Sequence, residues 1–183
     1  ELVQEGEFAQ NSTLLDLASN DYLGLSRHSN LIEAAEKAMQ TEGVGAASSR
    51  LITGSRKIHQ LLENTLADWL GRESVLLFPS GFQANLAAVI ALTDRFTPVI
   101  TDKLIHHSIL VGIKASGAKL KRFAHNNFND LEKQLKSCAN NYPSHRPLVI
   151  TESLFSMEGT SPPLDTLSQI CEKYGSRLLV DEA

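Results

Sequence analysis

The feature that most constrains the fold is an alternation of short apolar runs with stretches of helical period, which begins near residue 74. Between the runs, apolar residues recur at helical spacing, as Leu86, Val89 and Ile90 do. A repeated strand–helix–strand order favours right-handed crossovers and a mainly parallel sheet with helices on both faces. The sequence therefore predicts an α/β fold. The predicted strands are residues 75–78, 98–100, 120–123, 148–150 and 178–180.

Residues that begin and end helices agree with this order. Asn129 with Glu132 predicts a capping box at the start of one helix. Pro162 and Pro163 are expected to open the next helix, and Gly175 to end it.

Residues 1–72 follow a different pattern and are predicted to form an N-terminal arm with lead-in helices. The large α/β body is then expected at 73–183. A short extended piece is expected at 14–17, and no internal repeat or linker is found.

Two helices are expected within this first part. One is opened by Asn30 and ended by Gly43, and the other is stopped by Gly71. The second helix has one continuous apolar face, formed by Ile58, Leu61, Leu62, Leu66, Trp69 and Leu70.

Composition narrows the class of protein. Apolar residues make up 42% and charged residues 21% of the chain, which is ordinary for a soluble globular protein. A net charge of −4 without a basic stripe gives no support for nucleic-acid or membrane binding. Two cysteines, Cys138 and Cys171, without metal-ligand spacing, predict reduced thiols and a cytoplasmic location.

The turn FPSGFQAN, residues 78–85, is a candidate phosphate site. A helix that begins at Gly81 or Phe82 after a strand would offer free N–H groups and a positive dipole to a phosphate. Ser80 adds a hydroxyl, and Gly81 allows close backbone approach. The alternative is an ordinary strand-to-helix turn in which Ser80 is the N-cap.

Polar side chains follow the other predicted strands at their carboxyl ends, where ligands of parallel sheets bind. Asp102 and His106 follow one strand, Glu152 and Ser156 another, and Asp181 ends the last. A structural histidine and loop caps would explain the first two sets equally well. A part-buried Asp181 needs a cationic partner, and a cofactor with a protonatable ring nitrogen would supply one.

Several motifs stand in the order and spacing of a known family over nearly the whole chain. The sequence resembles the α-oxoamine synthases, which are pyridoxal-phosphate (PLP) enzymes of the aspartate-aminotransferase fold (PLP fold type I). The biotin-pathway branch is the most similar, and siblings that make aminolevulinate, 2-amino-3-oxobutyrate or sphingoid ketones share most motifs. The motifs are SNDYLGL (19–25), SRLITG (49–54) followed by His59, SGFQAN (80–85), DKLIHHS (102–108), RFAHNN (122–127), TESLFSMEG (151–159) and LLVDEA (178–183).

The resemblance implies roles for the cofactor-binding residues. Ser80, Gly81 and Phe82 would lie at the cofactor phosphate. His106 would stack on the pyridine ring and help to place the substrate, and Asp181 would pair with the pyridinium nitrogen. His106 and Asp181 would be the catalytic residues.

The remaining implied roles concern the ring hydroxyl and the substrates. Ser156 would bond the ring-hydroxyl side, Asn20 would reach towards the substrate carboxylate, and Glu152 would support the site. The implied reaction joins L-alanine to a pimeloyl thioester of coenzyme A or acyl carrier protein, with release of carbon dioxide. The implied assembly is a homodimer.

In the family a Schiff-base lysine lies downstream of the position of Ala183, with a C-terminal domain after it. The resemblance therefore implies a piece of a longer enzyme, and these 183 residues alone are expected to have no synthase activity. The chain departs from the family at His125-Asn126-Asn127, where a His-Asn-Asp triplet is usual. A non-catalytic α/β module for a phosphorylated ligand and an inactive subunit that pairs with an active sibling remain alternatives.

Overall fold

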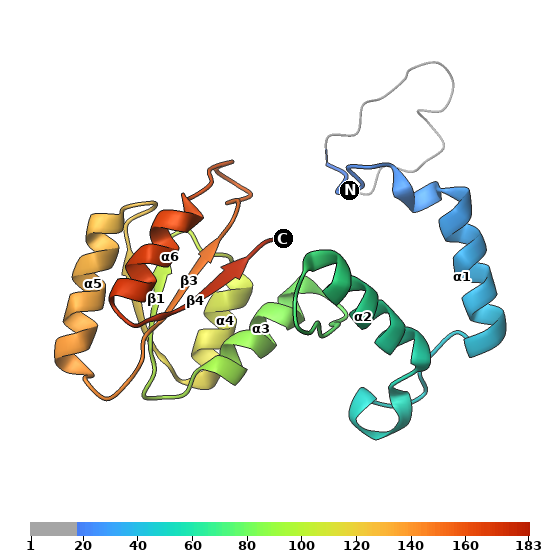
Figure 1. Cartoon of the computed structure of the whole chain (residues 1–183), viewed down its shortest axis with the longest axis horizontal. Helices are drawn as coiled ribbons and strands as arrows, with labels where there is room; N and C mark the ends of the chain where they lie inside the picture. The colour runs from blue at the N-terminus through green and yellow to red at the C-terminus, as the bar shows by residue number, and fades with distance from the viewer. Residues whose placement is uncertain (1–17) are drawn as a thin grey trace, which may run out of the picture. The chain divides into compact units, whose positions relative to one another are not determined.

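A computed structural model describes residues 18–183, so the extended piece expected at 14–17 lies outside the described residues. The chain divides into two units, residues 1–75 and 76–183, and each is described by itself (Figure 1).

The first unit is helical over the part that the structure describes. Its helix α1 begins one residue before the predicted N-cap Asn30, because His28 has the extended backbone of a cap, while Asn30 is already helical. Gly43 and Gly71 end α1 and α2 as predicted. The elements are η1 (Leu25–Arg27), α1 (Ser29–Glu42), the π-helical turn η2 (Arg50–Gly54) and α2 (Lys57–Leu70).

The SRLITG motif forms η2, and two contacts fix it. The N–H of Gly54 donates to the carbonyl of Ser49 at 2.8 Å, and a Cβ at position 54 would overlap the Ser48 carbonyl oxygen. Arg50 forms a two-pronged ion pair with Glu63, with N···O distances of 2.6 and 3.0 Å. Glycine is therefore required at position 54, and the motif is anchored to α2.

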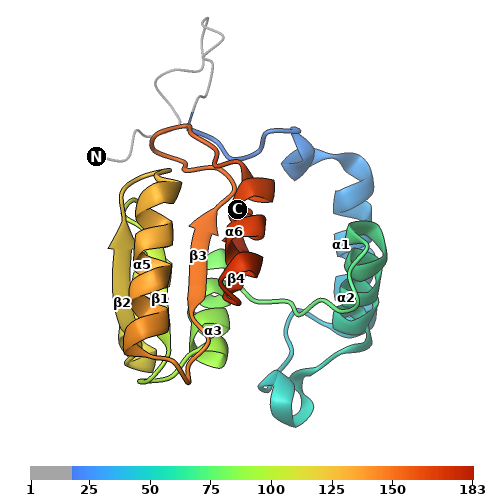
Figure 2. The same cartoon turned by 60° about the vertical axis from the view of Figure 1, so that its left-hand side comes forward.

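The second unit is the predicted α/β body. All strand pairings in its four-stranded sheet are parallel, and the strand order is β2-β1-β3-β4. Figures 1 and 2 show α5 and α6 on one face of the sheet and α3 and α4 on the other. The elements are α3 (Gly81–Leu92), β1 (Pro98–Asp102), α4 (His107–Ser116), β2 (Lys119–Phe123), α5 (Phe128–Asn141), β3 (Leu148–Glu152), α6 (Leu164–Lys173) and β4 (Arg177–Asp181).

Two predictions about individual elements are wrong. Residues 75–78 are not a strand. In the described part of the chain only β1, β2, β3 and β4 form strand pairs, and an extended run is a strand only when it pairs with a neighbouring strand. Asn129 does not cap α5: the Asn127 side chain accepts from the N–H of Asp130 at 3.0 Å. Glu132 instead accepts from Lys173 of α6 at 2.9 Å.

Two buried clusters hold the layers together. Ile100 and Val149 of the sheet meet α5 and α6 on one face, while Val99 and Ile150 meet α3 and α4 on the other. The helices α3 and α4 pack so closely that a Cβ on Gly112 would lie 2.9 Å from the Val89 Cβ. This close contact fixes the position of α3.

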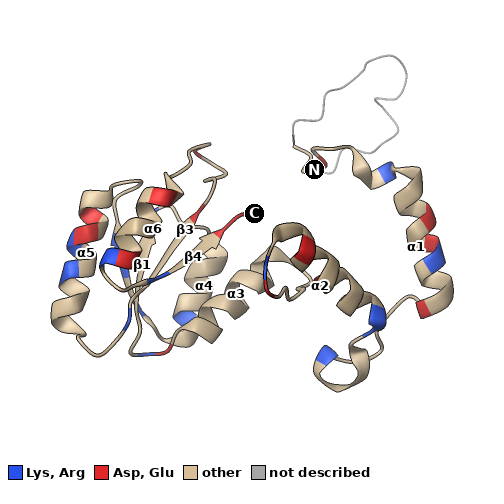
Figure 3. Cartoon of the chain, viewed as in Figure 1, with Lys and Arg blue, Asp and Glu red and all other residues tan. Residues whose placement is uncertain are grey.

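The helices differ in charge: α3 carries no charged residue, whereas α5 carries many (Figure 3).

Both cysteines are buried in the cluster beneath α5 and α6, and neither forms a disulfide. Burial raises the pKa of each thiol above its ordinary value. Among residues 18–183, no helix has both the length and the apolar character needed to cross a membrane.

Candidate functional site

The carboxyl edge of the sheet gathers most of the predicted site residues. Asp102, Glu152 and Asp181 are the last residues of β1, β3 and β4. Glu152 lies directly opposite Asp181 in the β3–β4 register. His106, at the start of α4, lies at the same edge because it follows β1 after a short turn. The parallel topology thus places acids and an imidazole where ligands of such sheets bind.

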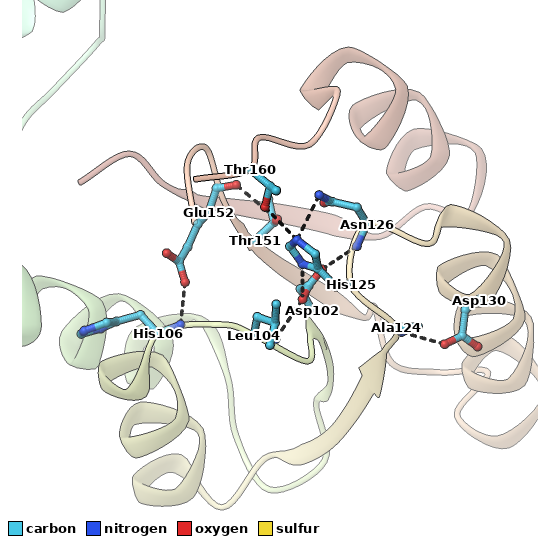
Figure 4. Close-up of polar contacts among 10 residues, drawn as sticks. All are labelled: Asp102, Leu104, His106, Ala124, His125, Asn126, Asp130, Thr151, Glu152 and Thr160. Carbon is cyan, nitrogen blue, oxygen red and sulfur yellow. Dashed lines mark hydrogen bonds and ion pairs between the residues drawn. The ribbon is translucent and has the colours of Figure 1, made fainter. Parts of the chain in front are cut away.

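Glu152 is bound directly to the turn before α4. Its Oε1 accepts the backbone N–H of His106 at 2.6 Å (Figure 4). The residue is only 8% exposed, and burial raises the pKa of its carboxyl group. The charge of Asp181 acts in the same direction, while the bond from His106 opposes it. Glu152 therefore holds the backbone of His106 in place.

Ser156 shares a cavity with His106 and Glu152. The cavity measures about 210 Å³ and lies between the β1–α4 turn and the loop that follows β3. Ser156 is exposed, whereas its neighbour Phe155 is buried and anchors the loop. The lining residues are Leu104, Ile105, His106, His107, Glu152, Phe155, Ser156, Met157 and Glu158.

Asp181 is linked to His106 through two further side chains. The Nδ2 of Asn85 lies 2.7 Å from Asp181 Oδ2 and 3.0 Å from Ser108 Oγ. The same Ser108 Oγ lies 2.7 Å from His106 Nδ1. A chain of hydrogen bonds therefore connects the Asp181 carboxylate to the His106 ring through side chains of α3 and α4.

The start of α3 has the geometry expected of FPSGFQAN. Ser80 is the N-cap, and its side chain accepts from the N–H of Gln83 at 3.2 Å. Its carbonyl accepts from Ala84 at 3.0 Å. Within residues 18–183 the N–H groups of Gly81 and Phe82 have no protein acceptor, and both residues are exposed. Ser80 thus caps the helix, and two first-turn N–H groups stay open to an anion.

A second network lies at the same edge, around Asp102. The carboxylate accepts from the N–H groups of Leu104 and Asn126, each at 2.9 Å, and bonds His125 Nδ1 at 3.0 Å. His125 Nε2 lies 2.8 Å from Thr160 Oγ1 (Figure 4). The His125 ring also meets the Phe155 ring edge-on. Asp102 thus braces the loop carrying Ser156 rather than contacting His106.

Asn20 belongs to the first unit, so its place relative to the strand ends stays a prediction. It is exposed, and its Oδ1 accepts from the hydroxyl of Tyr22 at 3.3 Å. The adjacent Asp21 accepts from Leu25 and Ser26 and closes the SNDYLGL turn. The hydroxyl of Ser26 lowers the pKa of Asp21.

Sequence reasoning missed the roles of Asn85, Ser108 and His125. Asn85 stands in SGFQAN and Ser108 in DKLIHHS, but neither was given a function. One signal was present for Asn85: it is a polar residue within an otherwise apolar run, ANLAAVIAL (84–92), in α3. A half-buried amide in such a helix needs hydrogen-bond partners. His125 offered no comparable signal, because its partner Asp102 ends β1, 23 residues earlier in the chain.

Comparison with known proteins places the chain in a family. The model for aminotransferase class I and II matches residues 12–183. An 8-amino-7-oxononanoate synthase from Photobacterium profundum is 40% identical over 176 residues, which are 96% of this chain and 45% of that protein. A putative 8-amino-7-oxononanoate synthase from Bacillus cereus is 43% identical over 170 residues, 93% of this chain and 42% of that protein. The chain spans a little under half the length of these relatives.

Solved structures agree. A serine palmitoyltransferase variant from S. paucimobilis with a bound PLP–myriocin aldimine has a TM-score of 0.84 at 32% identity, covering 88% of this chain and 41% of that one. An 8-amino-7-oxononanoate synthase from Francisella tularensis has a TM-score of 0.72 at 32% identity, covering 93% and 45%. The predicted α/β fold of PLP fold type I is confirmed. This chain belongs to the aminotransferase class I and II family, among the α-oxoamine synthases.

Proposed function

We propose that this chain is the cofactor-binding part of a PLP-dependent acyltransferase. The proposed reaction condenses L-alanine with a pimeloyl thioester, with loss of carbon dioxide, to give 8-amino-7-oxononanoate. The relatives with 40–43% identity carry the name of that synthase. The proposed boundary between the arm with its helices and the large domain stays at residues 72 and 73, and a homodimer in the cytoplasm is the proposed setting.

The observation that carries the proposal is the set of hydrogen bonds that the Asp181 carboxylate accepts. Its Oδ2 accepts from Asn85, its Oδ1 accepts from the N–H of Ala183 at 3.0 Å, and the residue is half-buried. An ionised carboxylate has about four acceptor positions. Among residues 18–183 the other two have no donor, so they are available for the N–H of a protonated pyridine ring, and the residue fits the ring nitrogen of PLP.

The phosphate of PLP fits the start of α3. The open N–H groups of Gly81 and Phe82 and the hydroxyl of Ser80 would hold it, helped by the helix dipole. Ser80 lies five residues before Asn85, which is bound to Asp181, so α3 itself connects the phosphate end of the site to the ring end.

Bound PLP supplies an electron sink for the negative charge that develops on the amino acid as its bonds at Cα break. Asp181 would hold the proton on the ring nitrogen. His106, fixed through its backbone by Glu152, would cover the ring and help to place the substrate. Ser156, on the braced loop, would donate to the ring-hydroxyl side, and Asn20 would bind the substrate carboxylate.

A sphingoid-base type of reaction is the second candidate, because the serine palmitoyltransferases give the higher TM-scores, 0.82–0.84 against 0.72. The two candidates share the cofactor site and differ in amino acid and acyl chain.

One assay separates them. The full-length protein is incubated with PLP and either alanine plus pimeloyl-CoA or serine plus palmitoyl-CoA, and the ketone product and carbon dioxide are quantified. We expect product from the alanine pair. Product from the serine pair alone would replace the proposed substrates, and absence of thioester-dependent product from every pair would overturn the acyltransferase.

A further inference from the structure

We propose that Asn85 is a positioning residue that transmits the orientation of Asp181 to His106 and fixes that imidazole as the Nε2–H tautomer. The place of this device in catalysis rests on the proposed function.

The carboxylate decides how the amide of Asn85 is turned. Asp181 Oδ2 lies 2.7 Å from the terminal amide atom of Asn85. An ionised carboxylate only accepts hydrogen bonds, so that atom must be the NH₂ nitrogen. The flipped amide would set two oxygens against each other at this distance. The acid therefore fixes the amide orientation.

The amide in turn decides the role of Ser108. The same Nδ2 lies 3.0 Å from Ser108 Oγ, and an amide nitrogen has no acceptor capacity. Ser108 Oγ must therefore accept from Asn85. Its hydroxyl keeps one hydrogen and one further acceptor position, and the hydrogen is free to point at the neighbouring His106 Nδ1 at 2.7 Å. Ser108 is fully buried, so no solvent competes for that hydrogen.

A second donor reaches the same nitrogen of His106. The backbone N–H of Ser108 lies 3.3 Å from Nδ1, as expected where His106 caps α4. With two donors directed at it, Nδ1 is an acceptor, and in the neutral ring the proton resides on Nε2. His106 then presents an N–H donor, not a lone pair, from its free nitrogen.

A purely structural role makes a different prediction. If His106 only caps α4, its tautomer depends on Ser108 alone. It is then insensitive to Asp181, which lies at the end of β4. If Asn85 transmits the orientation, a change at Asp181 alters the ring nitrogens of His106 through two intervening side chains. An uncharged amide at position 181 offers either a donor or an acceptor to Asn85. The direction in which the hydrogen bonds between position 181 and His106 are donated is then no longer fixed.

The test is ¹⁵N NMR of histidine-labelled full-length protein free of cofactor, with the His106 signals assigned by His106→Gln. In the wild type we expect an unprotonated Nδ1 and a protonated Nε2. Asn85→Leu and, independently, Asp181→Asn should shift both signals towards a mixture of tautomers. Gln83→Leu, an exposed amide on the same helix, is the matched control and should change neither signal.

A proton on Nδ1 in the wild type overturns the proposal, and this result needs no variant to fold. Unchanged His106 signals in both Asn85→Leu and Asp181→Asn would also overturn it. In the cofactor-loaded enzyme, Asn85→Leu should lower kcat about tenfold with little change in KM for the amino acid. Because the NMR arm uses no cofactor, absence of synthase activity would contradict the proposed function and leave the tautomer assignment standing.

Discussion

Asp102 Oδ1 lies 3.0 Å from His125 Nδ1, and this contact joins the end of β1 to the turn after β2. Asp102 is 1% exposed, and its carboxylate also accepts two backbone N–H groups. His125 continues the connection to Thr160, on the loop that carries Ser156. The carboxylate therefore supports the site without lining its cavity.

Asp102→Ala should be strongly destabilising, because it leaves two backbone donors and an imidazole nitrogen without their acceptor. Each buried polar group left unpaired costs about 1–3 kcal/mol, so we expect the free energy of unfolding to fall by about 3 kcal/mol or more. Urea unfolding of the full-length protein measures this. Glu172→Ala, at an exposed position of α6, is the control and should change stability by less than about 0.5 kcal/mol. Equal midpoints for the two variants would contradict the bracing role.

Asn127 explains why the departure from the family's His-Asn-Asp triplet is tolerated. Its side chain caps α5 by accepting from Asp130, and asparagine and aspartate are equally good N-caps. Asn127→Asp should therefore leave stability nearly unchanged, whereas Asn127→Ala should cost about 0.5–2 kcal/mol. Thermal unfolding of both variants checks this, and a loss in Asn127→Asp as large as in Asn127→Ala would show that the cap is not what the position provides.

The raised pKa of Glu152 predicts how the stability of the protein depends on pH. Burial raises the pKa of its carboxyl above the ordinary 4.5, so the native state keeps the proton to higher pH than the unfolded state. Between these two pKa values the native state binds more protons, and its stability falls as pH rises. Glu152→Gln removes this titration and keeps an acceptor for the N–H of His106.

The difference in unfolding free energy, Glu152→Gln minus wild type, should therefore increase as pH rises above about 4.5. Denaturant unfolding at a series of pH values measures it. A difference that decreases over this range would show that the hydrogen bond from His106 outweighs the cost of burial.

The sequence predicted the parts of the fold whose signal is local. The apolar runs at 98–100 and 178–180 lie within β1 and β4, which extend to 98–102 and 177–181, and the Gly81 helix start follows from the FPSGFQAN turn. The run at 75–78 has the same composition, yet it is not a strand. Strand formation depends on a partner, and no property of the run itself reveals whether one is present.

The candidate site also has residues that local sequence predicted and residues that it did not. Position at a strand end predicted Glu152, His106 and Asp181, because parallel topology alone brings them to one edge. The link through Asn85 was not predictable in the same way: Asn85 and Asp181 are 96 residues apart, and their contact depends on how α3 packs on the sheet. Such pairing is decided by tertiary packing and not by local pattern.

The central claim is that Asp181 is the partner of the cofactor ring nitrogen. The most direct test is the turnover of Asp181→Asn per cofactor-loaded full-length molecule, with alanine and pimeloyl-CoA. Asparagine keeps the shape but not the charge, and a hydrogen bond to a charged group contributes roughly 1.5–3 kcal/mol. We predict that the variant retains cofactor and that kcat falls about ten- to a hundredfold. A loaded variant that turns over at the wild-type rate would show that Asp181 only ends a strand.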